Sequence, residues 1–232
     1  MIHSIGTALP AWSAGGVRIV GDDEDVVTLA VAAGRAALGA TPTDAVTTVV
    51  FVSRDFPLLE GGNSAPLLAG LDLPDHVDVR EQLGGGPAAL QAVADAAAGT
   101  LVIGADTGGA AGAAAVLCTD EGAAVSMVGR VTRSLPVATR APTGATTDYA
   151  DPRLLRVLGV GASLAELDLG QLVAVAGVSP KDAQAIAGGA VPALPATGAS
   201  APLFALAAVA EQGASGTVLA IEQATVVAVD LG

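Results

Sequence analysis

The chain has 232 residues, which is enough for one domain or for two closely fused halves with a sizeable core. Hydrophobic residues make up 52% of it and aromatic residues only 2%, so Ala, Val, Leu and Gly must build most of the core. The net charge of -13 argues against binding to nucleic acid, because a phosphate backbone is neutralised by Lys and Arg.

Two further features limit the class of protein. The longest apolar runs are interrupted by Gly, Asp or Arg before they could cross a bilayer, and the first residues lack a basic segment followed by an apolar one. The single cysteine, Cys118, excludes an internal disulfide and fits a reducing compartment. We therefore expect a cytoplasmic protein without a membrane segment.

The first half of the chain alternates predicted strands and helices. Its acidic run at residues 22–25 opens a helix that closes at Gly39, because carboxylates favour the positive end of a helix. A metal site at this run is disfavoured, since no histidine lies near it and the carboxylates are adjacent. The other predicted elements are strands at residues 2–8, 46–55, 76–80, 100–105 and 113–118, a short helix near 64–69, and a helix over 87–98.

The second half repeats this order after a loop at residues 138–150. Its predicted elements are strands at 125–135, 172–176, 217–221 and 225–231, a helical piece at 152–158, a helix over 180–187 begun by Ser179, and a helix over 201–213. Each of the two apolar helices, 87–98 and 201–213, precedes a pair of strands. This internal repeat predicts two similar halves, residues 1–122 and 123–232, joined in one compact unit with both helices between two sheets.

The glycine turn before the helix over 87–98 is a candidate binding site. Gly84, Gly85 and Gly86 leave backbone amides bare, and Pro87 suits the first helical position, so this end could hold an anion or an oxyanion. The spacing differs from the GxGxxG of dinucleotide-binding folds, which weakens that alternative. The sequence also has no Ser in a GxSxG context and no zinc-ligand spacing.

The order of these segments resembles the thiolase superfamily, and most closely its 3-hydroxy-3-methylglutaryl-CoA synthase and ketoacyl synthase III branch. The resemblance implies a duplicated, layered α-β-α-β-α sandwich with two central buried helices. The chain is shorter than a typical member, so we expect the loops that line the substrate tunnel to be trimmed. The resemblance tapers over residues 138–167 and rests on GDDEDVVTLAVAAGRAAL (21–38), VVFVSRDFP (49–57), GGGPAALQA (84–92), GADT (104–107) and GAAGAAAVL (109–117).

The catalytic positions implied by the resemblance are all apolar in this chain. In the family, a cysteine at the start of the central helix takes the acyl group as a thioester, assisted by a histidine and an asparagine or second histidine. The matching positions, placed to within one or two residues, are Leu83 for the cysteine, Ala176 for the histidine and Ala196 for the asparagine. Three losses in matching segments indicate that covalent catalysis is absent.

The remaining reactive side chains have simpler interpretations. Cys118 lies in a predicted strand with no histidine nearby, which indicates a core residue. His3 and His76 are expected at strand ends with ordinary partners. Asp55 falls where this branch often carries a glutamate general base. Alone it would have nothing to act on, so an ordinary loop aspartate is the favoured interpretation, and Asp55 stays a candidate acid or base.

We therefore expect a non-catalytic thiolase-fold subunit that pairs with an active thiolase-like or 3-hydroxy-3-methylglutaryl-CoA synthase-like enzyme and completes or scaffolds its complex. The resemblance also implies a small OB-fold zinc-ribbon protein as a partner, an oligomer, and no metal or cofactor. The alternative is a divergent acyl-CoA lyase or transferase without a cysteine nucleophile, with Asp55 or Asp106 as base and the Gly84–Gly86 amides as oxyanion hole. The ligand of such an enzyme would be a coenzyme A thioester. A third possibility is a binding or sensing module, which would bind the same ligand without turnover.

Overall fold

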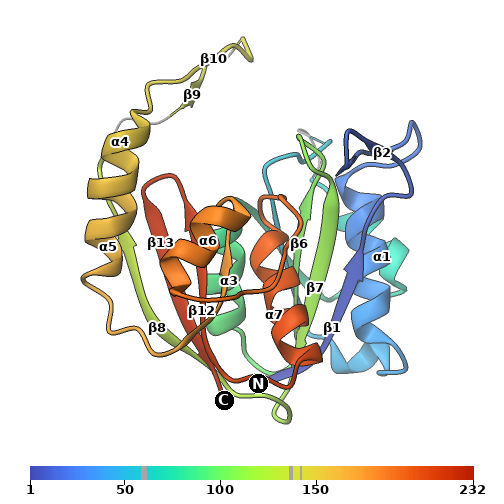
Figure 1. Ribbon diagram of the computed structural model, residues 1–232. Coiled ribbons are helices and arrows are strands. Elements are labelled where there is room, and N and C mark those ends of the chain that lie inside the picture. Colours follow the sequence, from blue (N-terminus) through green and yellow to red (C-terminus); the bar gives the residue numbers. More distant parts are fainter. Residues whose placement is uncertain (59–61, 136–137, 142) are drawn as a thin grey trace.

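The computed structural model of the chain contains two large β-sheets, with helices between them and on their outer faces (Figure 1). The structure describes residues 1–58, 62–135, 138–141 and 143–232. In the first half the elements are β1 (Ile2–Ala8), β2 (Ser13–Ala14), β3 (Val17–Arg18), α1 (Val26–Leu38), η1 (Thr43–Ala45), β4 (Thr48–Ser53), α2 (Ser64–Leu71), β5 (Asp78–Leu83), α3 (Gly86–Ala94), β6 (Thr100–Asp106) and β7 (Gly112–Cys118).

The second half begins with β8 and repeats much of this order. Its elements are β8 (Val125–Thr132), β9 (Thr139–Arg140), β10 (Thr146–Thr147), α4 (Pro152–Leu154), η2 (Leu155–Gly161), α5 (Ala162–Leu164), β11 (Leu172–Ala176), α6 (Pro180–Ala187), α7 (Ala201–Glu211), β12 (Gly216–Glu222) and β13 (Thr225–Leu231).

The two large sheets have corresponding strand orders. The five-stranded sheet has the order β1-β7-β6-β4-β5, and the four-stranded sheet has the order β8-β13-β12-β11. In the larger sheet, β6 and β7 run antiparallel to each other, and β4 is parallel to β6. In the smaller sheet, β12 and β13 run antiparallel in the same way, and β11 is parallel to β12. Among the described residues, β5 has no counterpart in the smaller sheet, so the larger sheet ends in an additional edge strand.

Helices α3 and α7 lie side by side between the two sheets (Figure 1). Helix α3 contacts β4 and β6 on one side and β8, β12 and β13 on the other. Helix α7 contacts β1 and β7 as well as β11 and β12. Small side chains on nearly every face of both helices permit this, since no face has to be solvated. The predicted layered fold with two central buried helices is confirmed.

The outer faces of the sheets are covered by the remaining helices. Helices α1 and α2 cover the five-stranded sheet, and α4, η2, α5 and α6 cover the four-stranded one (Figure 1). Helix α1 begins where predicted, because the Asp25 carboxylate accepts a hydrogen bond from the Thr28 amide at 2.8 Å while the Asp25 amide donates to the Thr28 hydroxyl. It ends at Gly39, which has a φ of 53°.

Several element boundaries differ from the sequence prediction, and two of them lie on β5 and α3. Strand β5 runs to Leu83, because each of its residues from Asp78 onward pairs with β4. Helix α3 ends at Ala94 instead of residue 98, since Gly99, with a φ of 78°, turns the chain into β6. In the described part of the chain, no helix is both long and apolar enough to cross a membrane.

Candidate functional site

A small cavity of about 60 Å³ lies where the start of α3 meets the ends of β11 and β12. Gly86 contributes the first turn of α3, and Ala176 contributes the last residue of β11. The complete lining is Gly86, Ala176, Gly177, Thr197, Gly198, Ile221 and Glu222. A larger cavity of about 350 Å³ shares Ala176, Gly177 and Thr197 and extends over the start of α6. The junction of the two halves is therefore hollow at the end where α3 begins.

The structure brings together two of the three apolar positions that the sequence singled out. Ala176 is buried and lines both cavities, and Ala196 lines the larger one. Leu83 ends β5, and 77% of its surface is exposed. It is not among the residues that line either cavity, so the side chain at the expected nucleophile position faces solvent.

A carboxylate lies against the glycine turn at the start of α3. Both oxygens of Glu222 lie so close to Gly85 that a Cβ on this glycine would overlap them. Gly85 is the N-cap of α3, whose first amides give that end a partial positive charge. The anion that the sequence predicted for Gly84–Gly86 therefore has a counterpart within the chain, the side chain of Glu222.

The pKa of Glu222 is subject to two opposing effects, burial and the positive charge of Arg54. The side chain of Glu222 is only 23% exposed, and its carboxylate forms an ion pair with Arg54, with 2.8 Å between Oε1 and Nη1. Burial raises the pKa of Glu222 above its ordinary value, the positive charge of Arg54 lowers it, and the nearby Asp106 raises it. The carboxylate is thus held at the site by Arg54 and α3 while burial disfavours its charge.

Replacing Glu222 with Gln should remove a pH-dependent term from the stability. Because the pKa of Glu222 is raised in the folded state, its contribution is complete at low pH and is lost as the pH rises through the folded pKa. The wild type should therefore lose stability relative to Glu222→Gln as the pH rises above 4.5, the ordinary pKa of a glutamate. Urea unfolding of both proteins at several pH values between about 4 and 8 measures this difference.

Glu211→Gln, at an exposed position on α7, is the matched control and should show no such trend. A wild type that gains stability over Glu222→Gln across the same pH range would show that the pairing with Arg54 outweighs burial.

Thr197 adds a polar atom without a partner to the small cavity. The residue is 8% exposed, and its Oγ1 is buried without a hydrogen-bond partner among the described residues. A buried hydroxyl without a partner carries a free-energy cost of about 1–3 kcal/mol. The cavity therefore combines one carboxylate, one unsatisfied hydroxyl and the first turn of a helix.

Asp55 and Asp106, the bases considered in the alternative function, both accept hydrogen bonds from backbone amides. Oδ2 of Asp55 accepts hydrogen bonds from the Thr107 and Gly108 amides at 2.8 and 2.9 Å. Asp106 accepts from the Ala199 and Ser200 amides and from the Ser200 hydroxyl at 2.6–2.8 Å. Burial raises the pKa of Asp106, and its hydrogen bonds lower it, while the charge of Asp55 raises it. Neither residue lines the two cavities.

The remaining candidate groups lie elsewhere. Cys118 ends β7 and is 1% exposed; burial raises the pKa of its thiol to about 11, so it stays protonated and unreactive at neutral pH. His3 lies on β1 and His76 lies in the turn before β5, both exposed. In the described part of the chain, no three His, Cys, Asp or Glu side chains gather as a metal site would require.

Sequence reasoning did not find Glu222, Arg54 or Thr197. The signal for Glu222 was a single charged residue at the end of the apolar strand TVLAI, where the following turn could point it back into the molecule. Arg54 follows a buried strand in the same way. Only the packing of the two halves shows that these two strand ends face each other.

Comparison with solved structures places this arrangement in a known architecture. OleA of Xanthomonas campestris, in its H285D form, is similar over 99% of this chain and 97% of its own, with a TM-score of 0.77 and 15% identity. The 3-oxoacyl-[acyl-carrier-protein] synthase III of Aquifex aeolicus is similar over 99% and 98%, with a TM-score of 0.77 and 13% identity. The chain has a thiolase-like fold.

The thiolase-like fold is also shared with FabH of Pseudomonas aeruginosa, which has a TM-score of 0.72 and 16% identity and covers 99% of this chain and 96% of its own. No protein-family model and no curated protein matches the sequence. At these identities the comparisons establish the layered fold alone, and they leave the chemistry to the residues of this chain.

Proposed function

We propose that this chain is a non-catalytic thiolase-fold subunit, which pairs with an active thiolase-like or 3-hydroxy-3-methylglutaryl-CoA synthase-like enzyme and completes or scaffolds its complex. The observation that carries the proposal is the identity and exposure of the residue at position 83. At the position expected for the nucleophile, the chain has an unreactive side chain that is 77% exposed, at the end of an open edge strand.

The environment of Leu83 argues against covalent catalysis in the same protein. Thioester chemistry needs a thiolate and then an oxyanion near the start of the central helix, where the helix end stabilises negative charge. Here the Glu222 carboxylate lies against Gly85 at that end and would repel both. The one cysteine of the chain is buried in β7.

Among the described residues, the outer edge of β5 pairs with no other strand, which supports the pairing. The Asp78 amide donates to the Thr47 carbonyl and the Gly84 amide to the Ser53 carbonyl, so even-numbered residues of β5 bond to β4. Amide directions alternate along a strand, which leaves the amides and carbonyls of Val79, Glu81 and Leu83 toward the open edge. Such an edge, with an exposed leucine at its end, is suited to pairing with a strand of another chain.

Replacing Leu83 with Cys should not create a condensing enzyme. The new thiol would face solvent at the end of β5, and Ala176 and Ala196 supply no histidine or asparagine to assist it. We expect no condensation of acetyl-CoA with malonyl-CoA or acetoacetyl-CoA above the wild-type background, measured by release of free coenzyme A. Sustained turnover by Leu83→Cys alone would contradict the non-catalytic assignment.

The direct test is native mass spectrometry of the tagged chain purified from its own source cells. The expected result is a fixed stoichiometry with a thiolase-like chain that carries an intact active-site cysteine. A small OB-fold zinc-ribbon protein in the same complex would identify the second partner that the resemblance implies, and a cytoplasmic complex is expected. Recovery of the chain only as a monomer or only with itself would overturn the proposal.

One observation favours a second candidate function, a divergent acyl-CoA lyase or transferase without a cysteine nucleophile. Glu222, with its raised pKa, lines a cavity together with an unsatisfied hydroxyl, an arrangement that is typical of acid–base sites. A screen of coenzyme A thioesters against the isolated chain tests it. Turnover that Glu222→Gln abolishes and Asp55→Asn leaves unchanged would establish this function with Glu222 as the base.

A further inference from the structure

The two outer helix pairs of the duplicated fold pack in different ways. In the first half, α1 and α2 contact each other directly: a Cβ on Gly34 of α1 would lie 2.6 Å from Leu71 of α2, and a Cβ on Gly70 of α2 would overlap Val31 of α1. Arg35 also donates a 2.6 Å hydrogen bond from Nε to the Gly70 carbonyl. The absence of side chains at these two glycines lets the helices close over their sheet.

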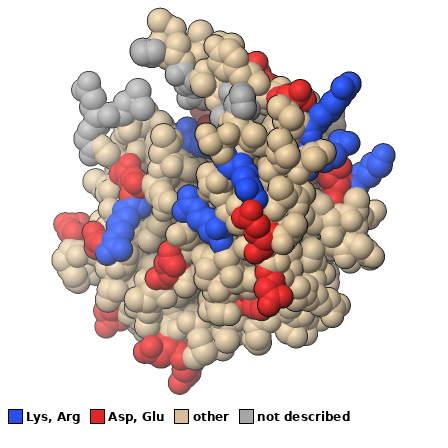
Figure 2. Space-filling view, turned by 90° about the vertical axis from the view of Figure 1, so that its left-hand side faces the viewer, with Lys and Arg blue, Asp and Glu red and all other residues tan. Residues whose placement is uncertain are grey.

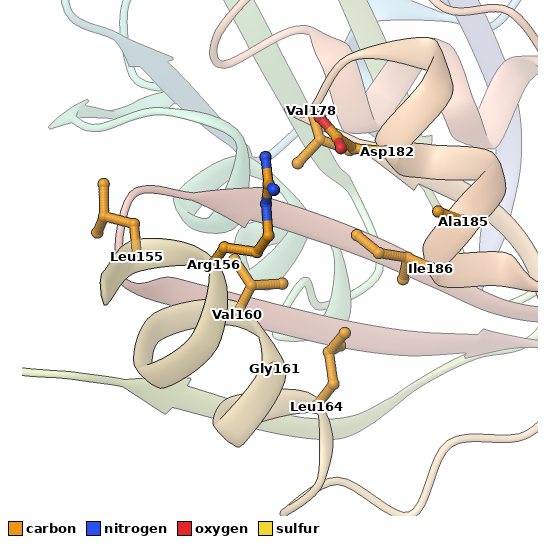
Figure 3. Close-up of a pocket in the computed structure, with 9 residues that line it drawn as sticks. All are labelled: Leu155, Arg156, Val160, Gly161, Leu164, Val178, Asp182, Ala185 and Ile186. Carbon is orange, nitrogen blue, oxygen red and sulfur yellow. The ribbon is translucent and has the colours of Figure 1, made fainter. Parts of the chain in front are cut away.

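In the second half, the corresponding pair is separated. The continuous helical segment α4-η2-α5 and helix α6 cover the four-stranded sheet (Figure 1). A cavity of about 380 Å³ lies between them, and Figure 3 shows the residues that line it. Its volume is within the range of about 300 to 1,000 Å³ that is typical of small-molecule pockets. The wall consists mainly of aliphatic side chains from both sides, Leu155, Val160, Leu164, Val178 and Ile186.

One wall of this cavity is an irregular helix. Element η2 is a π-helix, and it contributes Leu155, Arg156, Val160 and Gly161 to the lining. A π-helix is rare, and it is frequently found at functional sites. The small and aliphatic residues of this segment would suit a regular α-helix. At the cavity the helix is instead widened into a π-helix.

Arg156 supplies a positive charge at the apolar cavity. Figure 3 shows its side chain extending from η2 toward Val178 and Asp182 on the opposite wall. Among the described residues, the Arg156 guanidinium has no ion pair and no hydrogen bond. Figure 2 views the molecule from this side and shows Lys and Arg side chains on it, although the chain as a whole carries a net charge of -13.

Asp182 is the second charged residue of the lining, and it has a structural role. Its amide donates the N-cap hydrogen bond of α6 to the Ser179 hydroxyl, and its carboxylate accepts a 2.7 Å hydrogen bond from the same hydroxyl. It lies in the first turn of α6, where a carboxylate is favoured by the helix dipole. Arg156 is thus the charged group of the cavity that remains available to a ligand.

We propose that this cavity binds a medium-chain carboxylate, with the alkyl chain between η2 and α6 and the carboxylate on the Arg156 guanidinium. An aliphatic wall selects an apolar chain because burial removes that chain from water. A guanidinium fork selects a planar carboxylate through two parallel hydrogen bonds. This site lies on the outer face of the four-stranded sheet, and it does not depend on the function proposed for the chain.

Isothermal titration calorimetry with sodium decanoate, below its micelle-forming concentration, tests the site. Decanoate should bind the wild type with one site per chain, and butanoate should bind more weakly by up to about fourfold for each methylene removed. Decyltrimethylammonium, which has the same chain with a positive head group, should bind at least about tenfold more weakly than decanoate.

Variants at the two ends of the ligand separate the contributions of charge and cavity. Arg156→Gln should weaken decanoate binding by about tenfold or more, whereas Arg153→Gln, which removes an exposed arginine outside the lining, should leave it unchanged. Ala185→Phe places a ring in the cavity from α6 and should abolish binding while the circular dichroism spectrum stays that of the wild type. Asp182→Asn, which removes a like charge, should tighten binding.

Three results would overturn the proposal. They are absence of decanoate binding to the folded wild type, equal affinity for decanoate and decyltrimethylammonium, and wild-type affinity in both Arg156→Gln and Ala185→Phe. The last result would place bound decanoate at another surface, and the second would show that the head group is not recognised.

Discussion

Replacing Leu83 with Pro should lower the affinity of the chain for the thiolase-like partner that we propose by about 100-fold or more. The Leu83 amide faces the open edge of β5, so its loss removes no hydrogen bond within the chain. A proline ring at this position takes away one donor for a neighbouring strand and obstructs that strand sterically. The measurement is the dissociation constant of the purified complex, obtained by surface plasmon resonance.

Leu83→Gln is the matched control, because it removes the apolar side chain and keeps the amide. It should weaken the complex less than Leu83→Pro, and both variants should unfold within about 1 kcal/mol of the wild type, as exposed substitutions usually do. Equal affinity of Leu83→Pro and the wild type would show that the partner does not pair with β5.

Replacing Asp106 with Ala should lower the free energy of unfolding by about 3–5 kcal/mol. Asp106 is 5% exposed, and its carboxylate accepts three hydrogen bonds from the turn that starts α7. Its removal leaves the buried amides of Ala199 and Ser200 without acceptors, at the contact between the two halves. Part of this cost is offset because the carboxylate itself is desolvated, as the raised pKa of Asp106 indicates. Urea unfolding at pH 7 measures the loss.

Ser200→Ala is the graded control for Asp106. It removes one of the three donors and leaves both amides bonded, so about 1 kcal/mol of stability should be lost. If Asp106→Ala costs no more than Ser200→Ala, the carboxylate does not hold the two halves together. A change in the dependence of unfolding on urea would instead show that the halves no longer unfold as one unit.

Much of the fold could be predicted because its signals are local. Apolar runs bounded by glycine or polar residues gave the strands β1, β4, β7, β12 and β13 close to their observed bounds. Caps fixed α1 and α6, since Asp25 and Ser179 accept hydrogen bonds from amides three residues later. The small-residue composition of α3 and α7 indicated two sheets around them, because a helix without a polar face needs cover on both sides.

The site could be predicted only in part. The sequence shows that Leu83, Ala176 and Ala196 are apolar, and the resemblance explains why that matters. It does not show that Ala176 and Gly86 line one cavity, because this contact joins the two halves of the chain. The β2–β3 hairpin was also missed, since two-residue strands carry no periodicity.

The sequence by itself determined the order of the elements, the two central helices and the absence of a cysteine at the start of α3. Each of these depends on residue types within a few positions of one another. Only the tertiary structure decided that Glu222 lies against Gly85, that Asp106 binds amides up to 94 positions away, and that η2 and α6 stand apart. These features come from the way one half packs on the other and on its sheet, and a contact between distant segments leaves no periodic trace in either of them.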